Sequence, residues 1–418
     1  MTTSLGEHFF RHEFGRLVAT LSRRVGLRHL EAVEDAVQEA LLAAVDSWPK
    51  TVVPDNPSAW LYRVAHNRFV GELRRQARRG ALDELHAAAE PEADESAPEL
   101  RLAGDVRDDL LRMLFVCCDE AIPIESQLAL ALKTLCGFDV REIAARLFTT
   151  EANVYKRLGR ARSCLREPPL READVTTDRL TTRLPVVQGV LYLLFTEGYL
   201  SVHAETAIRR ELCDEARRLT TLLAEHPVSA TPETFALLAL MHLHTARMAA
   251  RQDVAGGLVL LEDQDRSRWD QTLIHEGLHW LARSAAGATF SRFHAEAGIA
   301  AEHCVAPSFA ETRWDRVIEC YALLERVAPS PLHLLNRAVA TAELHGPAQG
   351  LALLEGIDPP TWLSGSYMWS AVLADLHRRA GNDAVAESYR RTALETAPSA
   401  SIREVLTRRL ARAGARSR

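Results

Sequence analysis

Apolar residues in the first 170 positions recur every three or four residues, the spacing that places them on one face of an α-helix. Such stripes predict helices near residues 14–25 and 33–48, and a third in the segment that begins at Ser58. The segments that follow show the same spacing, and none alternates apolar and polar residues as a half-buried strand would. The pattern therefore predicts an all-α protein.

Two short helices joined by a tight turn are predicted between residues 139 and 166. Asp139 and Glu142 have the spacing of a capping box, which marks the start of the first helix. A hydroxyl in the turn Phe148-Thr149-Thr150 can cap the second helix. The buried stripe of the second helix consists of Val154, Leu158, Ala161 and Leu165.

The opposite face of this second helix is basic, with five basic residues and no acidic one from Lys156 to Arg166. In a helix-turn-helix, the second helix enters the major groove of DNA, where Asn and Arg read base edges and basic side chains hold phosphates. An ordinary helical hairpin with a solvated basic face is the alternative. The predicted DNA contacts, all at outward positions, are Asn153, Lys156, Arg157, Arg160 and Arg162.

Two polar groups stand out among the N-terminal helices. Asp35, Gln38 and Glu39 lie together, away from the apolar stripe of their helix, as residues of a solvated face usually do. The third helix should place Trp60 and Val64 near the core. Aromatic residues beside basic ones can bind single-stranded DNA by stacking and phosphate neutralisation, although such a tryptophan more often belongs to the core. The predicted DNA contacts here are Asn67, Arg68, Arg74 and Arg75.

Charge changes sign sharply after the third helix. Residues 60–80 carry six arginines and one glutamate, whereas residues 81–109 carry ten acidic residues and two arginines. The acidic segment is also rich in Ala and Pro, which predicts an acidic linker at residues 83–104. The N-terminal domain then occupies residues 7–82, and the helix-turn-helix domain occupies residues 105–168.

Bulk composition narrows the class of protein. The 418 residues carry a formal net charge of −6, which is not the basic balance of a protein that binds DNA tightly alone. The seven cysteines show no metal-binding or paired spacing, and no apolar run approaches membrane-spanning length. We expect a cytoplasmic protein with reduced thiols and with no metal, cofactor or membrane association.

The order of these features resembles the extracytoplasmic-function class of bacterial RNA polymerase sigma factors. EDAVQEALLAAV, NPSAWLYRVAHNR, the acidic linker and REIAARL…NVYKRLGRAR follow one another as region 2, linker and region 4 do in that class, over about residues 7–167. The resemblance implies a non-enzymatic protein that directs core RNA polymerase to promoter DNA and opens it. Core polymerase would supply most of the grip on DNA, so the chain need not be basic.

The resemblance also implies roles for individual residues. Asp35, Gln38 and Glu39 would dock on the clamp coiled coil of the largest polymerase subunit. The Pro49–Pro57 loop and Asn67 would hold an unpaired base of the downstream promoter element, and the Asn153–Arg162 helix would read the upstream element. Tyr155 and Gly159 stand where common members carry basic or polar residues, so the upstream sequence preference stays open.

The chain continues far beyond region 4. Predicted helix ends carry Pro227, Pro329 and Pro398, separated by roughly three and two periods of about 34 residues. The last unit, SAVLADLHRRAGNDAVAESYRRTALETAPSA, resembles a tetratricopeptide repeat, whose stacked helices form a surface that holds peptides or other domains. A helical bundle with accidental spacing is the alternative.

Residues 180–418 thus resemble the C-terminal tetratricopeptide-like domain of a sigma subgroup, a domain thought to control activity. The resemblance implies a regulatory protein as a partner of the repeats. The apolar run Val186–Phe195 begins about 20 residues after the basic helix ends. We therefore expect residues 184–200 to contact region 4.

Two other functions compete with this interpretation. HEGLH, from His275 to His279, fits the HExxH motif of zinc proteases, with Glu296 or Glu302 as a distant third ligand and His294 and His303 nearby. The extended motif would need Gly at position 282 and His at 285, and both are Ala. A ligand-sensing helix-turn-helix regulator would explain the basic helix and the extension, but not AWLYRVAHNR or the acidic linker, and it would usually be dimeric.

Overall fold

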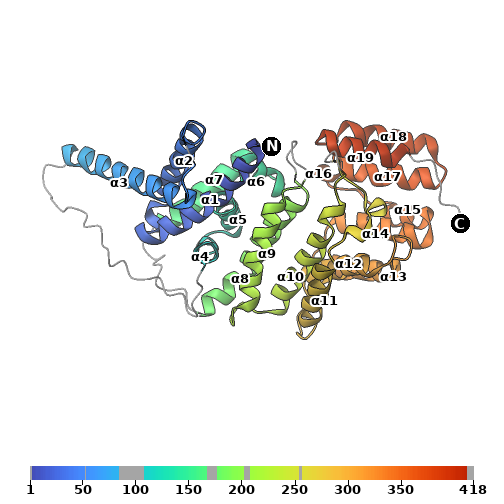
Figure 1. Cartoon of the computed structure of the whole chain (residues 1–418). Helices are drawn as coiled ribbons and strands as arrows, with labels where there is room; N and C mark the ends of the chain where they lie inside the picture. The colour runs from blue at the N-terminus through green and yellow to red at the C-terminus, as the bar shows by residue number, and fades with distance from the viewer. Residues whose placement is uncertain are drawn as a thin grey trace. The chain divides into compact units, whose positions relative to one another are not determined.

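The computed structural model describes residues 2–51, 53–83, 108–166, 177–201, 208–253 and 257–411, and these residues form helices joined by turns (Figure 1). They contain an isolated bridge between Gln252 and Leu258 but no strand, so the predicted all-α class is confirmed. The predicted linker at 83–104 lies outside the described residues, apart from Asp83. The chain divides into two compact units, Met1–Val190 and Leu191–Arg418.

The first unit contains seven helices and the start of an eighth, among the described residues. The bounds of these helices are α1 Thr2–Val25, α2 Leu30–Ser47, α3 Pro57–Asp83, α4 Asp109–Cys117, α5 Ile124–Thr134, α6 Val140–Arg146, α7 Glu151–Arg166 and α8 Thr177–Tyr199. A 3-10 turn, η1 at Leu27–His29, joins α1 to α2. Gly26 precedes η1 at φ 87°, a conformation that glycine adopts readily.

Helices α1, α2 and α3 share one apolar core. Its buried residues include Leu17, Val18 and Leu21 of α1, Val33, Val37 and Ala40 of α2, and Leu61, Ala65 and Phe69 of α3. Trp60 and Val64, which were predicted to lie near the core, are half-buried, and the fully buried residue at the start of α3 is Leu61. Trp60 packs against Trp48 at the end of α2, with 5.6 Å between the ring centroids.

Helices α6 and α7 form the predicted helix-turn-helix. The Asp139 carboxylate accepts a hydrogen bond from the Glu142 backbone N–H at 2.7 Å, and the Glu142 carboxylate accepts one from the Asp139 backbone N–H at 2.7 Å, so the capping box is present. Thr150 Oγ1 accepts a hydrogen bond from the Asn153 backbone at 3.3 Å and caps α7. The α7 residues in the core are Val154, Leu158, Ala161 and Leu165, as predicted.

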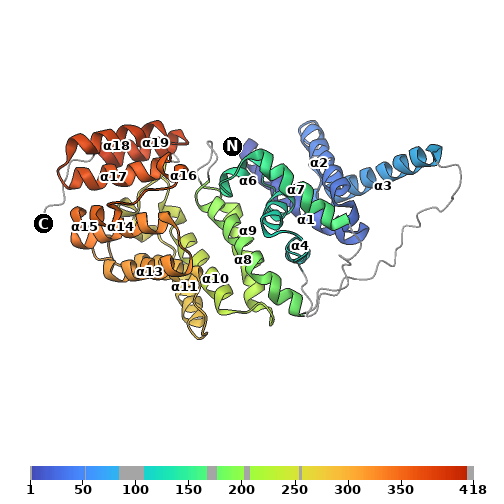
Figure 2. The same cartoon turned by 180° about the vertical axis from the view of Figure 1, so that it is seen from behind.

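The second unit consists mainly of neighbouring helix pairs (Figures 1 and 2). The bounds of its main helices are α9 Arg210–Glu225, α10 Pro232–Ala246, α11 Gln271–Ser284, α12 Arg292–Val305, α13 Trp314–Val327, α14 Pro331–His345, α15 Pro347–Leu354, α16 Thr361–Ser364, α17 Tyr367–Arg379, α18 Asp383–Glu395 and α19 Ala400–Ala411. Pro227, Pro329 and Pro398 follow the ends of α9, α13 and α18, as predicted.

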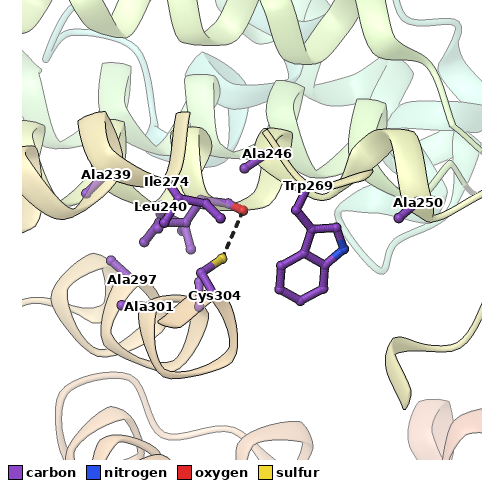
Figure 3. Close-up of a cluster of buried hydrophobic side chains, with 11 residues drawn as sticks. Ala239, Leu240, Ala246, Ala250, Trp269, Ile274, Ala297, Ala301 and Cys304 are labelled. Atoms are coloured by element: carbon purple, nitrogen blue, oxygen red, sulfur yellow. Dashed lines mark hydrogen bonds between the residues drawn. The ribbon is translucent and has the colours of Figure 1, made fainter. Parts of the chain in front are cut away.

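A buried cluster centred on α10 organises the first half of this unit. Figure 3 shows Leu240 and Ile274 facing Ala297, with Trp269 beside them. Cys304 Sγ donates a hydrogen bond to the Leu243 carbonyl at 3.5 Å. A Cβ added at Gly277 would lie 2.8 Å from Leu243 Cγ, so this glycine allows α11 to approach α10 closely.

None of the helices that the structure describes is both long enough and apolar enough to cross a membrane.

Candidate nucleic-acid interface

The exposed face of α7 is a polar and basic strip. Its buried stripe rests on α5 and α6, which leaves the opposite side of the helix to solvent. Asn153, Lys156 and Arg160 are exposed there as predicted. Tyr155, 63% exposed, lies among them, and Gly159 leaves open space beside it. We call these five residues the recognition face; they present hydrogen-bond donors and an aromatic ring to any ligand.

Arg157 and Arg162 do not share this face, contrary to the prediction that they point outward. Arg157 Nη2 donates to Glu125 Oε2 of α5 at 2.7 Å, and its side chain is only 15% exposed. Arg162 Nη2 donates to Glu34 Oε2 of α2 at 2.5 Å. Both positions lie at the borders of the apolar stripe, so each long side chain reaches across to a neighbouring helix instead of into solvent.

The three predicted polar residues of α2 lie together on its outer face. Asp35, Gln38 and Glu39 are exposed. The pKa of Asp35 is raised by partial burial and then by the negative charges of Glu31 and Glu39, against the nearby Arg162. Three carboxylates so close on one helix form a surface that favours a positively charged partner.

Two apolar residues extend this face, and the sequence analysis missed them. Leu42 is 59% exposed and Val45 is 50% exposed, so neither belongs to the core stripe of α2. They follow Asp35 by seven and ten residues, which places them on the same side of the helix. Their spacing from Asp35 would have been enough to place them on this face from the sequence. Carboxylates beside exposed aliphatic side chains are typical of a protein-binding surface.

Helix α3 displays the predicted basic residues to solvent. Asn67, Arg68, Arg74 and Arg75 are all exposed. Arg75 Nη2 lies 3.0 Å from Glu72 Oε2 one turn away, and Arg68 Nη1 donates to Glu39 Oε2 of α2 at 2.5 Å. The Arg68–Glu39 pair therefore joins the two predicted sites.

The HExxH segment does not assemble a metal site in the structure. His275, Glu276 and His279 are exposed on α11, and Glu276 Oε2 lies 3.2 Å from His242 Nδ1 of α10. Among the described residues, no three His, Cys, Asp or Glu side chains are placed to hold a metal ion together.

The N-terminal helices match a family of sigma factor domains. Residues 10–79, which run from α1 into α3, match sigma-70 region 2, and this match supports a sigma factor role in transcription initiation. A domain of this family implies binding to core RNA polymerase and promoter DNA. The match includes all seven predicted site residues of α2 and α3.

The rest of the chain has relatives as well. Residues 183–285 match a family of unknown function, DUF6596. The chain is 36% identical over 376 residues to the uncharacterized protein R00370 of Rhizobium meliloti (strain 1021), covering 90% of this chain and 88% of that protein. It therefore belongs to the same family as this rhizobial protein. No solved structure matches the chain.

Proposed function

We propose that the protein is a sigma factor of the extracytoplasmic-function type, which recruits core RNA polymerase to particular promoters and opens them without covalent chemistry of its own. The observation that carries this proposal is the combination of a region 2 match at 10–79 with a capped helix-turn-helix at 139–166. Helices α1–α3 would be region 2, and helices α4–α7 would be region 4.

Under this proposal, the exposed faces of α2, α3 and α7 each bind a different partner. The outer face of α2, made of Asp35, Gln38, Glu39, Leu42 and Val45, docks on polymerase. Asn67, Arg68, Arg74 and Arg75 of α3 hold the downstream element as its strands separate. The recognition face of α7 enters the major groove at the upstream element. Arg157 and Arg162 hold α7 against its neighbours in the free protein.

Reversing the charge of Asp35 should separate polymerase docking from folding. Asp35→Lys places a like charge against a basic partner, which costs several kcal/mol at an interface, so the affinity for core polymerase should fall about a hundredfold or more. Transcription from a cognate promoter by purified core and variant should fall in parallel. The measurements are core-binding titrations and run-off transcription with the full-length protein.

Asp178→Lys is the matched control for this experiment. It makes the same charge change at an exposed position of α8 and should leave core affinity unchanged. Equal losses in both variants would show that net charge, and not the α2 face, determines binding. Failure of the unmodified protein to bind core polymerase at any salt concentration would disprove the sigma factor proposal itself.

We also propose that the C-terminal helices form a tetratricopeptide-like domain that controls the sigma factor and holds a regulatory protein. Two features support this. Helices α17 and α18, of 13 residues each, pack as a pair about Gly381 at φ 80°. Pro329 and Pro398 follow helices of 14 and 13 residues, as expected for stacked helical repeats.

A truncated chain tests this control. The fragment should end at Val190, since Arg183 of α8 is bound to Asp119 and Glu120 and must be retained. We expect residues 1–190 to initiate less transcription than the full-length protein at equal polymerase occupancy. Equal activities would show that the C-terminal domain only holds another partner. A more active fragment would show that the C-terminal domain inhibits transcription initiation.

A further inference from the structure

Arg247 follows the last residue of α10 and is a buried cation of the second unit, with only 6% of its surface exposed. Among the described residues it forms no ion pair and no hydrogen bond, and its Nε atom is fully buried. Burial of a charge is strongly unfavourable unless another charge or a hydrogen bond compensates it. Because an arginine in a protein does not lose its proton, Arg247 requires an anion.

A second arginine lies in the same place. Arg266, the first residue of the 3-10 turn η5 Arg266–Arg268, is half-buried. The guanidinium carbons of Arg247 and Arg266 lie 5.4 and 4.4 Å from the centroid of the Trp269 ring. Burial lowers the pKa of Arg266, and the charge of Arg247 lowers it further. The structure thus holds two like charges around one indole, which belongs to the core cluster drawn in Figure 3.

Three buried N–H donors of this group have no hydrogen-bond acceptor among the residues that the structure describes. They are Arg247 Nε, Arg266 Nη2 and Trp269 Nε1. Arg266 Nη1, in contrast, donates to the carbonyl oxygens of His303 and Ala306 at 2.6 and 2.7 Å, so the guanidinium is held in place. Folded proteins leave few buried donors unsatisfied, so three at one place indicate a missing acceptor.

The acidic residues nearby do not supply this acceptor. Glu311 raises the pKa of Arg266, but it is exposed and accepts a hydrogen bond from Ser308 Oγ at 2.6 Å. Asp265 is exposed as well and accepts hydrogen bonds from its own turn, η5. Neither carboxylate is ion-paired with Arg247 or Arg266 in the described part of the chain. The positive charge of the two arginines therefore calls for an anion from outside the chain.

A cavity of about 250 Å³ adjoins the two arginines. His303 connects them: burial and then the charges of Arg247 and Arg266 lower the pKa of His303, and its side chain lines the cavity. Most other lining residues are apolar or aromatic, among them Leu260, Val317, Phe309, Trp314 and Tyr321. Apolar walls with a few polar groups at one place are typical of small-molecule sites.

The cavity suits the uncharged part of a ligand and not its anionic group. Its lining includes the carboxylates of Glu262 and Glu343 and the guanidinium of Arg409. Glu343 is ion-paired with Arg379 at 2.6 Å, and Arg409 lies 3.8 Å from Asp375. These charges are of both signs, so they do not attract an anion as the arginines around Trp269 do.

We propose that Arg247, Arg266 and Trp269 bind the phosphate group of a small phosphate monoester, whose organic part occupies the cavity beside His303. A phosphate monoester carries about −1.5 to −2 charges at pH 7, which balances two guanidiniums, and it offers three acceptor oxygens to the three unsatisfied donors. A single carboxylate would leave one arginine uncompensated. The three residues lie in the segment 183–285, which matches a family of unknown function, and the inference does not depend on the sigma factor proposal.

Calorimetric titration of the full-length protein in phosphate-free buffer near neutral pH tests this site. Phenyl phosphate should bind at least tenfold more tightly than benzoate, which has the same ring but one charge. Inorganic phosphate should compete with phenyl phosphate and bind more weakly, because it leaves the cavity empty. Arg247→Met should weaken the binding of phenyl phosphate at least tenfold. Arg326→Met, which makes the same charge change at an exposed position of α13, should leave it unchanged.

Urea unfolding without ligand separates a ligand-binding arginine from a structural one. Arg247→Met removes a buried charge that has no partner, so its unfolding midpoint should lie above that of the unmodified protein. Phenyl phosphate should raise the midpoint of the unmodified protein, since it binds only the folded state, and should not raise that of Arg247→Met. A lower midpoint for ligand-free Arg247→Met would show that the chain itself compensates this charge and would overturn the proposal. So would tighter binding of benzoate than of phenyl phosphate, or no binding of phenyl phosphate to the unmodified protein.

Discussion

Replacing Arg183 by methionine should destabilise the first unit by about 3–5 kcal/mol, the usual cost of removing one partner from a buried ion pair. Arg183 of α8 is 2% exposed and its guanidinium is ion-paired with Asp119, which is itself 5% exposed. It also donates to the Phe115 carbonyl and to Glu120, each at 3.2 Å. Methionine fills similar space but leaves the Asp119 carboxylate buried without its cation. Urea unfolding followed by circular dichroism measures the loss.

A double variant separates the missing charge from the missing packing. Asp119→Asn in the Arg183→Met background removes the uncompensated charge and should recover a large part of the lost stability. Thr181→Val, at an exposed position of the same helix, should change stability little. A loss below about 1 kcal/mol for Arg183→Met would show that solvent reaches Asp119 and screens it.

Local signals were sufficient to predict the helix pair α6–α7. The capping box at Asp139, the hydroxyl at Thr150 and the apolar stripe from Val154 are each read from neighbouring residues, and each is present as predicted. Exposure was equally predictable for Asp35, Gln38 and Glu39, which lie off the core stripe. Their roles remain predictions, because binding to polymerase or DNA depends on partners outside the chain.

Contacts between distant residues could not be predicted in the same way. Arg162 follows Glu34 by 128 residues and Arg183 follows Asp119 by 64, so no periodic pattern connects either pair. A basic residue at the edge of an apolar stripe can be exposed to solvent, bind DNA or pair with a buried carboxylate. The sequence pattern does not distinguish these three cases. The apolar periodicity also does not show, to within one residue, which side of a helix faces the core. For this reason the sequence did not reveal that Leu61, and not Trp60, is fully buried.

The expected contact between the extension and region 4 shows both what the sequence could predict and what it could not. The short connection after α7 indicated that the extension would begin close to region 4, and Arg183 does bind the α4–α5 turn. The sequence pattern drew attention to the apolar run that starts at Val186 instead of the arginine three residues before it. An apolar stripe is visible in a sequence, whereas a buried cation is recognised only once its partner is in place.

Lowering the pH from 7.5 to 5.0 should destabilise the second unit by several kcal/mol, because it buries neutral histidines. Burial, with the positive charges of Arg247 and Arg266, lowers the pKa of His303 to about 3, and burial with Arg217 lowers that of His242 to about 4. In the unfolded chain both titrate near 6.5. The unfolded state therefore binds more protons below pH 6.5, so stability is complete above that pH and is lost as the pH falls toward 3.

His303→Gln tests one of the contributions to this pH dependence. At pH 5.0 each such histidine contributes a loss of about 2 kcal/mol, so the variant should lose less stability between pH 7.5 and 5.0 than the unmodified protein does. Tryptophan fluorescence during urea unfolding reports mainly on this unit, which holds five of the seven tryptophans. His275→Gln, at an exposed position of α11, is the control and should keep the original pH dependence. If His303→Gln keeps it as well, the pKa of His303 is the same in the folded and unfolded states, and burial with Arg247 and Arg266 does not confine the imidazole to its neutral form.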